Sequence, residues 1–356
     1  MPSSSQIILC AAGGGKTSRI VDEAVEERAQ RSLLVTYTRN NTREIERKLY
    51  ERSGAIPPNI EVMTWFGFLL RELARPYRNA VHGRRIEGLC WIEGRSARYA
   101  SHSNVATHYF YDDRYIYSDK ISKFICACDE KTGGAVFRRL AQRFDRIYVD
   151  EIQDMAGYDI DVLERAMKAG VRFTLVGDHR QATFRTNQSN RNSAFGGIEI
   201  AQKFKQWEKA KIAALTHEQH TFRCHQQIAD LSDSLFPDDP PTKSLNDTVT
   251  GHDGVFIVPS ARVSDYVAEF SPQALRYDKR TDCLNLPAMN FGDSKGLTFD
   301  RVLIFPNGTA GKWLRSGNIA EIAGSITRMY VGITRARHSV AFVFDGTVKV
   351  GGAKNY

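Results

Sequence analysis

The stretch Cys10-Ala-Ala-Gly-Gly-Gly15-Lys16-Thr17 decides the fold class, because it joins an apolar run to a polar segment with helical periodicity. Glycines let backbone amides converge on phosphate oxygens, and the start of a helix adds partial positive charge. In such a loop the lysine reaches the β- and γ-phosphates and the threonine holds Mg²⁺. Cys10 stands where the usual pattern has glycine, so this segment alone leaves open a glycine-rich turn before an ordinary helix. The predicted nucleotide-binding residues here are Gly13, Gly14, Gly15, Lys16 and Thr17.

A second segment, Ile147-Tyr148-Val149-Asp150-Glu151, is a short apolar run that ends in two carboxylates. At the end of a buried strand, Asp150 can hold Mg²⁺ and Glu151 can orient and deprotonate an attacking water. A solvated acidic turn is the alternative interpretation of this segment alone. Together with Lys16, the two carboxylates favour a nucleotide hydrolase.

Apolar runs rich in isoleucine, valine and leucine recur along the chain, and several are followed by polar segments with helical spacing. This alternation predicts an α/β fold with largely parallel sheets. The runs lie at 6–12, 32–37, 145–150, 171–176, 254–258, 301–305 and 339–344, and the helical segments include 16–30, 39–52 and 158–169.

Two regions interrupt this alternation. Residues 76–144 contain 12 lysines and arginines against 7 acidic residues, together with 11 aromatic residues. Residues 183–200 are rich in asparagine, glutamine, serine and glycine. The first region predicts an inserted basic and aromatic subdomain, and the second indicates that the main domain boundary lies near 200–215.

The composition is that of a globular protein. The 356 residues are 25% charged and 42% hydrophobic, which suggests about two domains. The longest apolar run has six residues and no leader segment is visible, so we expect no membrane association. The six cysteines include no CxxC pair and are interpreted as reduced thiols of a cytoplasmic protein. The net charge of +8 fits a polyanionic partner.

Further along the chain, ordered motifs resemble those of UvrD/Rep-type superfamily 1 DNA helicases. The acidic box Asp150-Glu151-Ile152-Gln153-Asp154 resembles the DExQD motif of that family. Later segments are similar to the third to sixth motifs and follow in the family's order. They are Val176-Gly177-Asp178 with Gln181, Thr221-Phe222-Arg223, Ser294-Lys295-Gly296-Leu297-Thr298-Phe299 and Tyr330-Val331-Gly332-Ile333-Thr334-Arg335-Ala336.

The resemblance implies two RecA-like P-loop NTPase motor domains that hydrolyse ATP, with Mg²⁺, between them while moving on single-stranded DNA, 3′ to 5′. The implied ranges are 1–75 and 145–205 for the first motor domain, 76–144 for the inserted subdomain and 206–356 for the second motor domain. The implied catalytic residues are Glu151, Gln181, Arg223 and Arg335, with Thr17 and Asp150 at the metal. Phe222, which stacks on the nucleobase, and Gly296 join the nucleotide-binding residues.

The resemblance also implies a DNA-binding set. It consists of Tyr37, Thr38, Thr64, Phe66 and Phe184, whose aromatic rings stack on bases without reading their sequence. A second cluster of aromatic residues at 109–117 is interleaved with basic residues. This cluster predicts either a further nucleic-acid surface or a half-buried pair of strands.

The chain departs from the family in three places. Only fifteen residues precede Lys16, so the upstream glutamine that reads adenine is not expected and strict preference for ATP is left open. The fifth motif has Thr298, Asn290 and Gly292 where Glu, Thr and His are usual. Only 70 residues separate Arg223 from Ser294, which predicts a compact form without the 2B insertion. Its resemblance to helicases of Gabija-like antiviral defence loci implies an endonuclease partner.

Two functions of different classes follow. The first is an ATP-dependent DNA translocase or helicase. The second is a nucleotide- and DNA-gated regulatory ATPase that switches a partner effector, such as an endonuclease, without processive unwinding. A small-molecule kinase shares the phosphate loop but leaves Arg335 and Gln181 without a role. Stacking and phosphate contacts do not distinguish DNA from RNA.

Overall fold

The computed structural model describes residues 5–356, which divide into two compact units. The first unit comprises the residues up to Leu9, Lys16–His179 and Phe184–Thr216, and the second comprises Cys10–Gly15, Arg180–Thr183 and His217–Tyr356. Each unit is built on its own six-stranded sheet with parallel strand pairs. The predicted α/β class with two RecA-like units is confirmed. The domain limits derived from the resemblance stay predictions.

The sheet of the first unit has the strand order β3-β2-β7-β8-β1-β9. The pairs β3–β2, β2–β7, β7–β8 and β8–β1 are parallel. All residues of β2 and β8 are buried, as expected for central strands covered by helices on both faces. The strands are β1 (Ser5–Cys10), β2 (Ser32–Thr36), β3 (Ile60–Thr64), β7 (Arg146–Val149), β8 (Phe173–Gly177) and β9 (Ala213–Glu218).

The register of these strands brings their carboxyl ends to one edge of the sheet. Leu9 on β1 pairs with Gly177 on β8, and Val149 on β7 pairs with Val35 on β2. The loops that follow these strands therefore start side by side, at the edge where open parallel sheets bind ligands.

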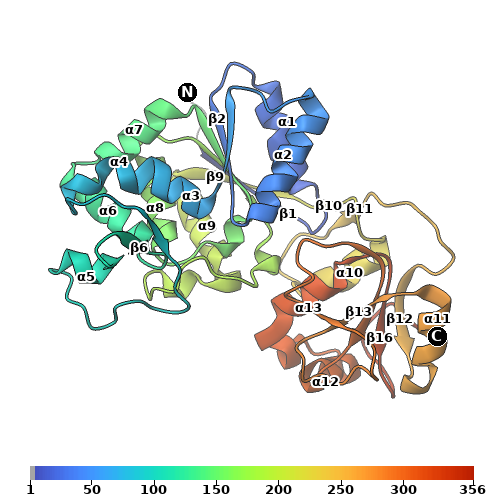
Figure 1. Ribbon diagram of the computed structural model, residues 1–356. Coiled ribbons are helices and arrows are strands. Elements are labelled where there is room, and N and C mark those ends of the chain that lie inside the picture. The colour runs from blue at the N-terminus through green and yellow to red at the C-terminus, as the bar shows by residue number, and fades with distance from the viewer. Residues whose placement is uncertain (1–4) are drawn as a thin grey trace. The chain divides into compact units, whose positions relative to one another are not determined.

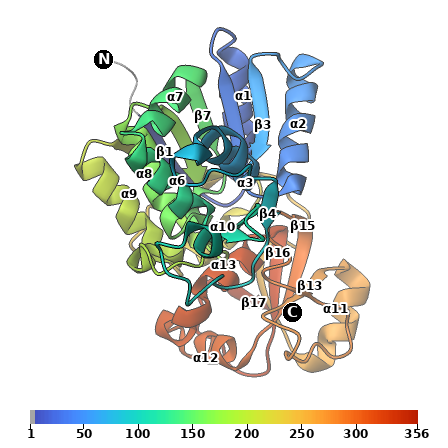
Figure 2. The same cartoon turned by 60° about the vertical axis from the view of Figure 1, so that its left-hand side comes forward.

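Helices cover both faces of this sheet. In Figure 1, α1 and α2 lie together, while α6, α7 and α8 gather on the other side; Figure 2 shows the same separation. The longer helices are α1 (Lys16–Glu26), α2 (Arg39–Ser53), α6 (Ile121–Lys131), α7 (Ala135–Arg143), α8 (Tyr158–Lys168) and α9 (Ile200–Lys209). After β3 the chain forms α3 (Trp65–Phe68), the π-helix η1 (Leu69–Ala74), α4 (Arg75–Tyr77) and the 3₁₀ turn η2 (Arg78–Ala80). Further short 3₁₀ turns are η3 (Ile152–Asp154), η4 (His179–Gln181), η5 (Ser193–Phe195) and η6 (Gly197–Glu199).

The segment 76–144 contains a small sheet of its own, with the order β4-β6-β5, and the short helix α5. Phe110 and Ile116 on this sheet are buried in the same hydrophobic cluster as Leu33 and Ile147 of the large sheet. Tyr109 and Phe110 are therefore core residues of the first unit, and the half-buried strand pair is the interpretation that the structure supports. The elements are β4 (Gly88–Cys90), α5 (Val105–Tyr109), β5 (Phe110–Tyr111) and β6 (Tyr115–Tyr117).

The second unit has the strand order β14-β13-β15-β16-β12-β17, and all five pairs are parallel. Helix α11 lies on one side of this sheet, and α12 and α13 lie on the other (Figure 1). The strands are β12 (Gly254–Val258), β13 (Gln273–Arg276), β14 (Met289–Asn290), β15 (Phe299–Phe305), β16 (Ala336–Val343) and β17 (Ala353–Asn355). The helices are α10 (Gln226–Asp233), α11 (Val263–Phe270), α12 (Gly308–Ser316) and α13 (Ile326–Ile333), with the 3₁₀ segments η7 (Ser260–Arg262) and η8 (Ile319–Ser325). A separate parallel pair joins β10 (His220–Thr221) to β11 (Lys243–Ser244).

Two general properties accompany this fold. No helix in the described part of the chain is long and apolar enough to cross a membrane. None of the six cysteines, all of which lie within residues 5–356, is in a disulfide bond.

A buried carboxylate in α8 makes the stability of the first unit depend on pH. Asp159 is buried, its carboxylate accepts a hydrogen bond from Ser122, and burial raises its pKa to about 6. Because the folded-state pKa lies above the usual value, folding loses stability as pH rises through about 4 to 6. We expect Asp159→Asn to remove this loss. Its free energy of unfolding relative to wild type should increase by on the order of 1 kcal/mol between pH 5 and pH 8, measured by urea unfolding.

Asp145 provides a matched control of opposite sign. The Arg31 side chain and backbone hydrogen bonds lower the pKa of Asp145 to about 2. Its stabilisation is present above the usual carboxyl pKa and is lost only when pH falls towards 2. Asp145→Asn should therefore destabilise the protein equally at pH 5 and pH 8. The interpretation of Asp159 is wrong if the free energy of unfolding of Asp159→Asn, relative to wild type, is also the same at pH 5 and pH 8.

Candidate active site

The predicted nucleotide residues of the first unit meet at the carboxyl edge of its sheet. Lys16 and Thr17 begin α1, and Asp150 and Glu151 directly follow β7. The Thr17 hydroxyl donates a hydrogen bond of 2.7 Å to Asp150 Oδ2. Thr17 and Asp150, 133 residues apart in sequence, therefore meet within the first unit.

Asp150 is buried, and its second oxygen, Oδ1, accepts a hydrogen bond of 2.9 Å from the Glu151 backbone N–H. Burial and the adjacent Glu151 carboxylate raise the pKa of Asp150, while Lys16 and the Thr17 hydroxyl lower it. A buried carboxylate beside another carboxylate is a site where positive charge is favoured.

Glu151 has a strained backbone. Its φ of 57° lies in the left-handed region, which costs a residue other than glycine about 1–2 kcal/mol. Its carboxylate accepts a hydrogen bond from the Gln153 amide, and Gln153 Oε1 accepts one of 3.1 Å from the Asp178 backbone N–H. Gln153 thus links Glu151 to the end of β8. A Cβ at Gly177 would collide with the Gln153 side chain, so glycine is required there.

Sequence reasoning quoted Gln153 in the acidic box but gave it no role. The glutamine four residues after the end of β7 was the available signal. The contact with Asp178 depends on how β7 and β8 pair, and the sequence does not show this pairing directly.

In the second unit, the phosphate loop packs against the segment that resembles the fourth motif. Gly13 and Gly15 have φ values of 74° and 79°. The Thr221 hydroxyl donates to the carbonyl oxygen of Ala12 at 2.7 Å, and the Phe222 N–H donates to that of Gly13 at 3.0 Å. The Phe222 side chain lies beside Gly15 and is 60% exposed.

The rest of the loop is held as closely. A Cβ at Gly14 would lie 2.8 Å from the carbonyl oxygen of His220. The Ala12 N–H donates to the Tyr330 hydroxyl at 3.4 Å. Tyr330 belongs to the segment that resembles the sixth motif, and sequence reasoning did not select it as a site residue.

Two of the predicted catalytic residues are bonded to each other in the second unit. Arg335 is buried and donates from Nη2 to Gln181 Oε1 at 3.1 Å. Arg223 is partly buried and donates from Nη1 to the carbonyl oxygen of Thr334 at 3.0 Å. Gly296, with a φ of 86°, lies in the loop before β15.

Thr38 and Thr64, predicted to contact DNA, are helix caps. The Thr38 hydroxyl accepts the N–H of Asn41 at the start of α2, and the Thr64 hydroxyl accepts the N–H of Gly67 at the start of α3, both at 3.1 Å. Thr64 ends β3 and Thr38 lies two residues after the end of β2, so the caps fix the loops that face the same edge as Asp150.

The three aromatic residues predicted to bind DNA are in one cluster within the first unit. The Tyr37 ring centroid lies 5.8 Å from that of Phe66 and 4.9 Å from that of Phe184. Burial raises the pKa of Tyr37 to about 12, so its phenol is neutral at pH 7. A fourth ring, that of Trp91, lies 4.7 Å from Phe66 and was not predicted.

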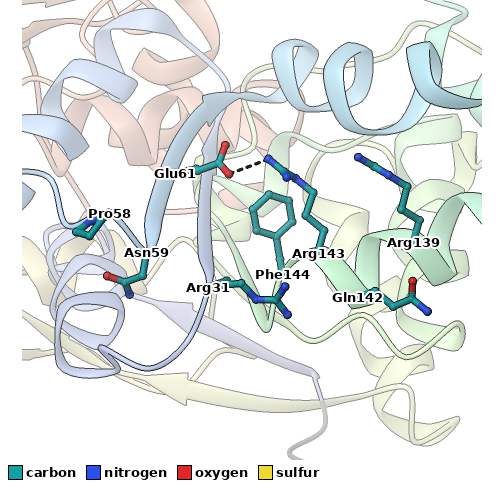
Figure 3. A pocket seen from close by; sticks show the side chains of 8 residues that line it. All are labelled: Arg31, Pro58, Asn59, Glu61, Arg139, Gln142, Arg143 and Phe144. Carbon is teal, nitrogen blue, oxygen red and sulfur yellow. Dashed lines mark hydrogen bonds and ion pairs between the residues drawn. The ribbon is translucent and has the colours of Figure 1, made fainter.

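A pocket of about 450 Å³ lies at the opposite edge of the sheet, where β2 and β3 begin (Figure 3). Its arginines are held in ion pairs, including Arg143 with Glu61 at 2.8 Å and Arg31 with Asp145 at 3.0 Å. None of the predicted site residues lines this pocket. It is lined by Arg31, Pro58, Asn59, Glu61, Arg139, Gln142, Arg143 and Phe144.

The residues at the carboxyl edge fit a nucleotide with a divalent cation. The Thr17 hydroxyl and the Asp150 carboxylate supply hard oxygen ligands, the type that Mg²⁺ prefers, and they lie close together. Within residues 5–356 there is no group of three metal-binding His, Cys, Asp or Glu side chains. This donor set suits a cation that takes its remaining ligands from phosphates and water.

No protein-family model matches the sequence, and no curated protein does. Among solved structures, the arterivirus nonstructural protein 10 (helicase) is similar, with a TM-score of 0.50 and 14% identity over 96% of this chain and 59% of that chain. The fold of this chain is similar to that of this viral helicase. The same viral protein in complex with DNA has a TM-score of 0.49, with 13% identity over 96% of this chain and 60% of that chain.

At 14% identity the likeness to this helicase structure concerns the fold alone. The chain spans 59% of the length of the viral helicase. The narrower assignment to the UvrD/Rep type stays a prediction, as do the roles of the individual site residues.

We expect Gly13→Ala to disable the phosphate loop. A Cβ there would lie 2.5 Å from Arg223 Cβ and 2.8 Å from the Thr221 hydroxyl, so the loop must move. Affinity for a fluorescent ATP analogue should fall at least about tenfold, which corresponds to about 1.4 kcal/mol.

Gly54→Ala is the matched control. Gly54 has the same φ of 74° but nothing within 4 Å of its Cβ position. This variant should lose about 1–2 kcal/mol of stability through backbone strain and keep wild-type affinity. Equal nucleotide affinities of the two variants would contradict the assigned role of the Gly13 contacts.

Proposed function

We propose that the protein is an ATP-hydrolysing motor that moves on single-stranded nucleic acid. The observation that carries this proposal is the 2.7 Å hydrogen bond between Thr17 and Asp150, next to the strained Glu151, in a fold similar to that of a viral helicase. It supports a site where a phosphate loop and a hydrolytic carboxylate act on one nucleotide.

Each residue has a role that its position supports. Lys16 stabilises the β- and γ-phosphates, and Glu151 accepts the proton of the attacking water. Arg335 and Arg223 stabilise the charge that develops on the transferred phosphoryl group, because guanidinium remains charged at all relevant pH values. Gln181, bonded to Arg335, senses the γ-phosphate.

Thr17 and Asp150 would hold Mg²⁺, which when bound neutralises charge on the phosphate oxygens. Phe222 would stack on the nucleobase with its exposed ring face. A ring contact of this kind is weakly selective among bases, so other nucleoside triphosphates belong in the assay beside ATP.

Single-stranded DNA is the proposed track, with movement 3′ to 5′. The ring cluster at the carboxyl edge supports a single-stranded track, because stacking requires unpaired bases. DNA is chosen over RNA from the resemblance to UvrD/Rep-type proteins alone, so both polymers need testing.

Steady-state ATP hydrolysis, with and without single-stranded DNA or RNA, tests the proposal. We expect strong stimulation by one polymer. Lys16→Ala and Glu151→Gln should reduce the stimulated rate by about 10²–10⁴-fold, because each removes a group that acts on the reacting phosphate or water. Hydrolysis unchanged in both variants would contradict the proposed site.

The arginine assignment has its own comparison. Arg335→Lys keeps the charge but loses the fork that bonds Gln181, and we expect it to lower the rate by at least about tenfold. Arg337→Ala, two residues away, removes a surface ion pair with Asp300 and should leave the rate within about twofold. A normal rate in a folded Arg335→Lys variant would contradict the proposed role.

One observation favours the second candidate, a regulatory ATPase that switches a partner without processive unwinding. The described chain between Arg223 and Ser294 runs from α10 to β14 and contains β11 and three strands of the second sheet, β12, β13 and β14, but no additional domain. A forked-duplex assay separates the two candidates, since the switch hydrolyses ATP but displaces no strand. The endonuclease partner and the role in antiviral defence rest on the resemblance alone and stay predictions.

A further inference from the structure

The four rings of the cluster differ sharply in exposure. The order along the cluster is Trp91, Phe66, Tyr37 and Phe184. The ends are exposed, Trp91 by 65% and Phe184 by 45%, whereas Phe66 in the middle is 5% exposed. The middle rings therefore support the two ends, and only the ends offer large faces to a ligand.

Trp91 is exposed although its backbone is fixed. It follows β4, which pairs with β6. On one side of it, the Ser118 N–H donates to the carbonyl oxygen of Cys90 at 2.9 Å; on the other, the Ile92 N–H donates to the Ser118 hydroxyl at 3.1 Å. Its ring also meets Phe66 edge to face, at an interplanar angle of 74°. The indole is thus held in place before any ligand binds, which lowers the entropic cost of binding.

The Trp91 loop and the Phe184 segment are tied to the same residue. Asp119 accepts hydrogen bonds from the Ser96 N–H at 2.9 Å and the Ser96 hydroxyl at 2.7 Å. Its carbonyl oxygen accepts one from Asn187 at 3.4 Å. The two exposed ends of the cluster therefore belong to one hydrogen-bonded framework within the first unit.

Each exposed or half-exposed ring has an exposed arginine close by in sequence. Arg39 follows Tyr37, Arg95 follows Trp91, and Arg185 follows Phe184. In the described part of the chain, none of these three guanidinium groups is in an ion pair with a carboxylate. Arg95 instead donates to the carbonyl oxygen of Gln188 at 3.0 Å. Exposed rings beside unneutralised cations suit a polyanion with planar bases.

We propose that Trp91 and Phe184 are two base-stacking positions for one single-stranded nucleic acid, and that the inserted segment 76–144 supplies Trp91 to this track. The inference rests on the proposed function and deepens it, because it assigns a nucleic-acid contact to a segment outside the motifs. Phosphates of the same strand are contacted by Arg95 and Arg185. Stacking makes the contact indifferent to base sequence.

Intrinsic fluorescence tests this directly, because the chain has four tryptophans and three of them are buried. Trp65, Trp207 and Trp313 are at most 2% exposed. Adding oligothymidylate or oligouridylate should quench the wild-type emission and leave that of Trp91→Phe unchanged. In anisotropy titrations with a labelled oligonucleotide, Trp91→Ala should bind about 5- to 150-fold more weakly, the equivalent of about 1–3 kcal/mol per base. Trp91→Phe, which keeps a ring, should restore most of the affinity.

Tyr99→Ala is the control in the same segment. Tyr99 is 100% exposed but is in none of the ring pairs of the described residues, so its loss should leave the affinity at the wild-type value. Binding by Trp91→Ala at wild-type strength, without quenching in wild type, overturns the inference. If ATP hydrolysis is still stimulated by the oligonucleotide, that result leaves the proposed function standing. A wild-type protein that binds neither oligonucleotide overturns both. Quenching at Trp91 without any ATP hydrolysis supports the stacking position and overturns only the motor.

Discussion

The hydrogen bond from Thr17 to Asp150 joins the two halves of the candidate chemistry, and the parallel register of the sheet makes it possible. Five strands end at one edge, so Thr17 at the start of α1 and Asp150 after β7 meet although 133 residues separate them. The meeting point is buried, which disfavours the charge on Asp150, and Glu151 adds to this. A bound cation would offset both the burial of Asp150 and the repulsion from Glu151. The electrostatics of this point and the arrangement of the strands therefore both favour a divalent cation.

The phosphate loop also depends on residues more than 200 positions away. The Thr221 hydroxyl donates to Ala12 and accepts the N–H of Arg223 at 3.2 Å. Phe222, between them in sequence, donates its own N–H to Gly13. The segment 221–223 therefore fixes both the conformation of the phosphate loop and the positions of Phe222 and Arg223. A change in the loop conformation alters the positions of these two residues, and a change in their positions alters the loop. Such coupling is what a nucleotide-driven motor needs, since occupancy of the loop must alter the position of other groups.

Sequence reasoning predicted the parts whose chemistry is local. Lys16, Thr17, Asp150 and Glu151 follow buried strands, and the alternation of apolar runs and helical segments predicted two parallel sheets, which the structure confirms. Sequence reasoning predicted the residues at strand ends better than it predicted which side chains are exposed, because exposure depends on packing between residues far apart in sequence. Tyr109 and Phe110, read as either surface or strand residues, are buried in the core, whereas Trp91, in a segment with no motif, is exposed. Nothing near Trp91 in sequence reveals that Ser118 fixes its loop.

An exposed aromatic residue is unremarkable when it stands alone, as Tyr99 does, since singly scattered apolar residues are normal on protein surfaces. Trp91 differs because its backbone is bonded on both sides and its ring rests on buried Phe66. Because the backbone on both sides of Trp91 is fixed, the loop cannot fold so as to bury the indole. The apolar area of the indole, which a flexible loop would bury, therefore stays exposed to solvent. Burying such a side chain contributes about 25 cal/mol per Å² of apolar area, and a binding partner that covers the ring gains this contribution. In the first unit, the proposed stacking position at Trp91 thus keeps exposed an apolar area that a bound nucleic acid would cover.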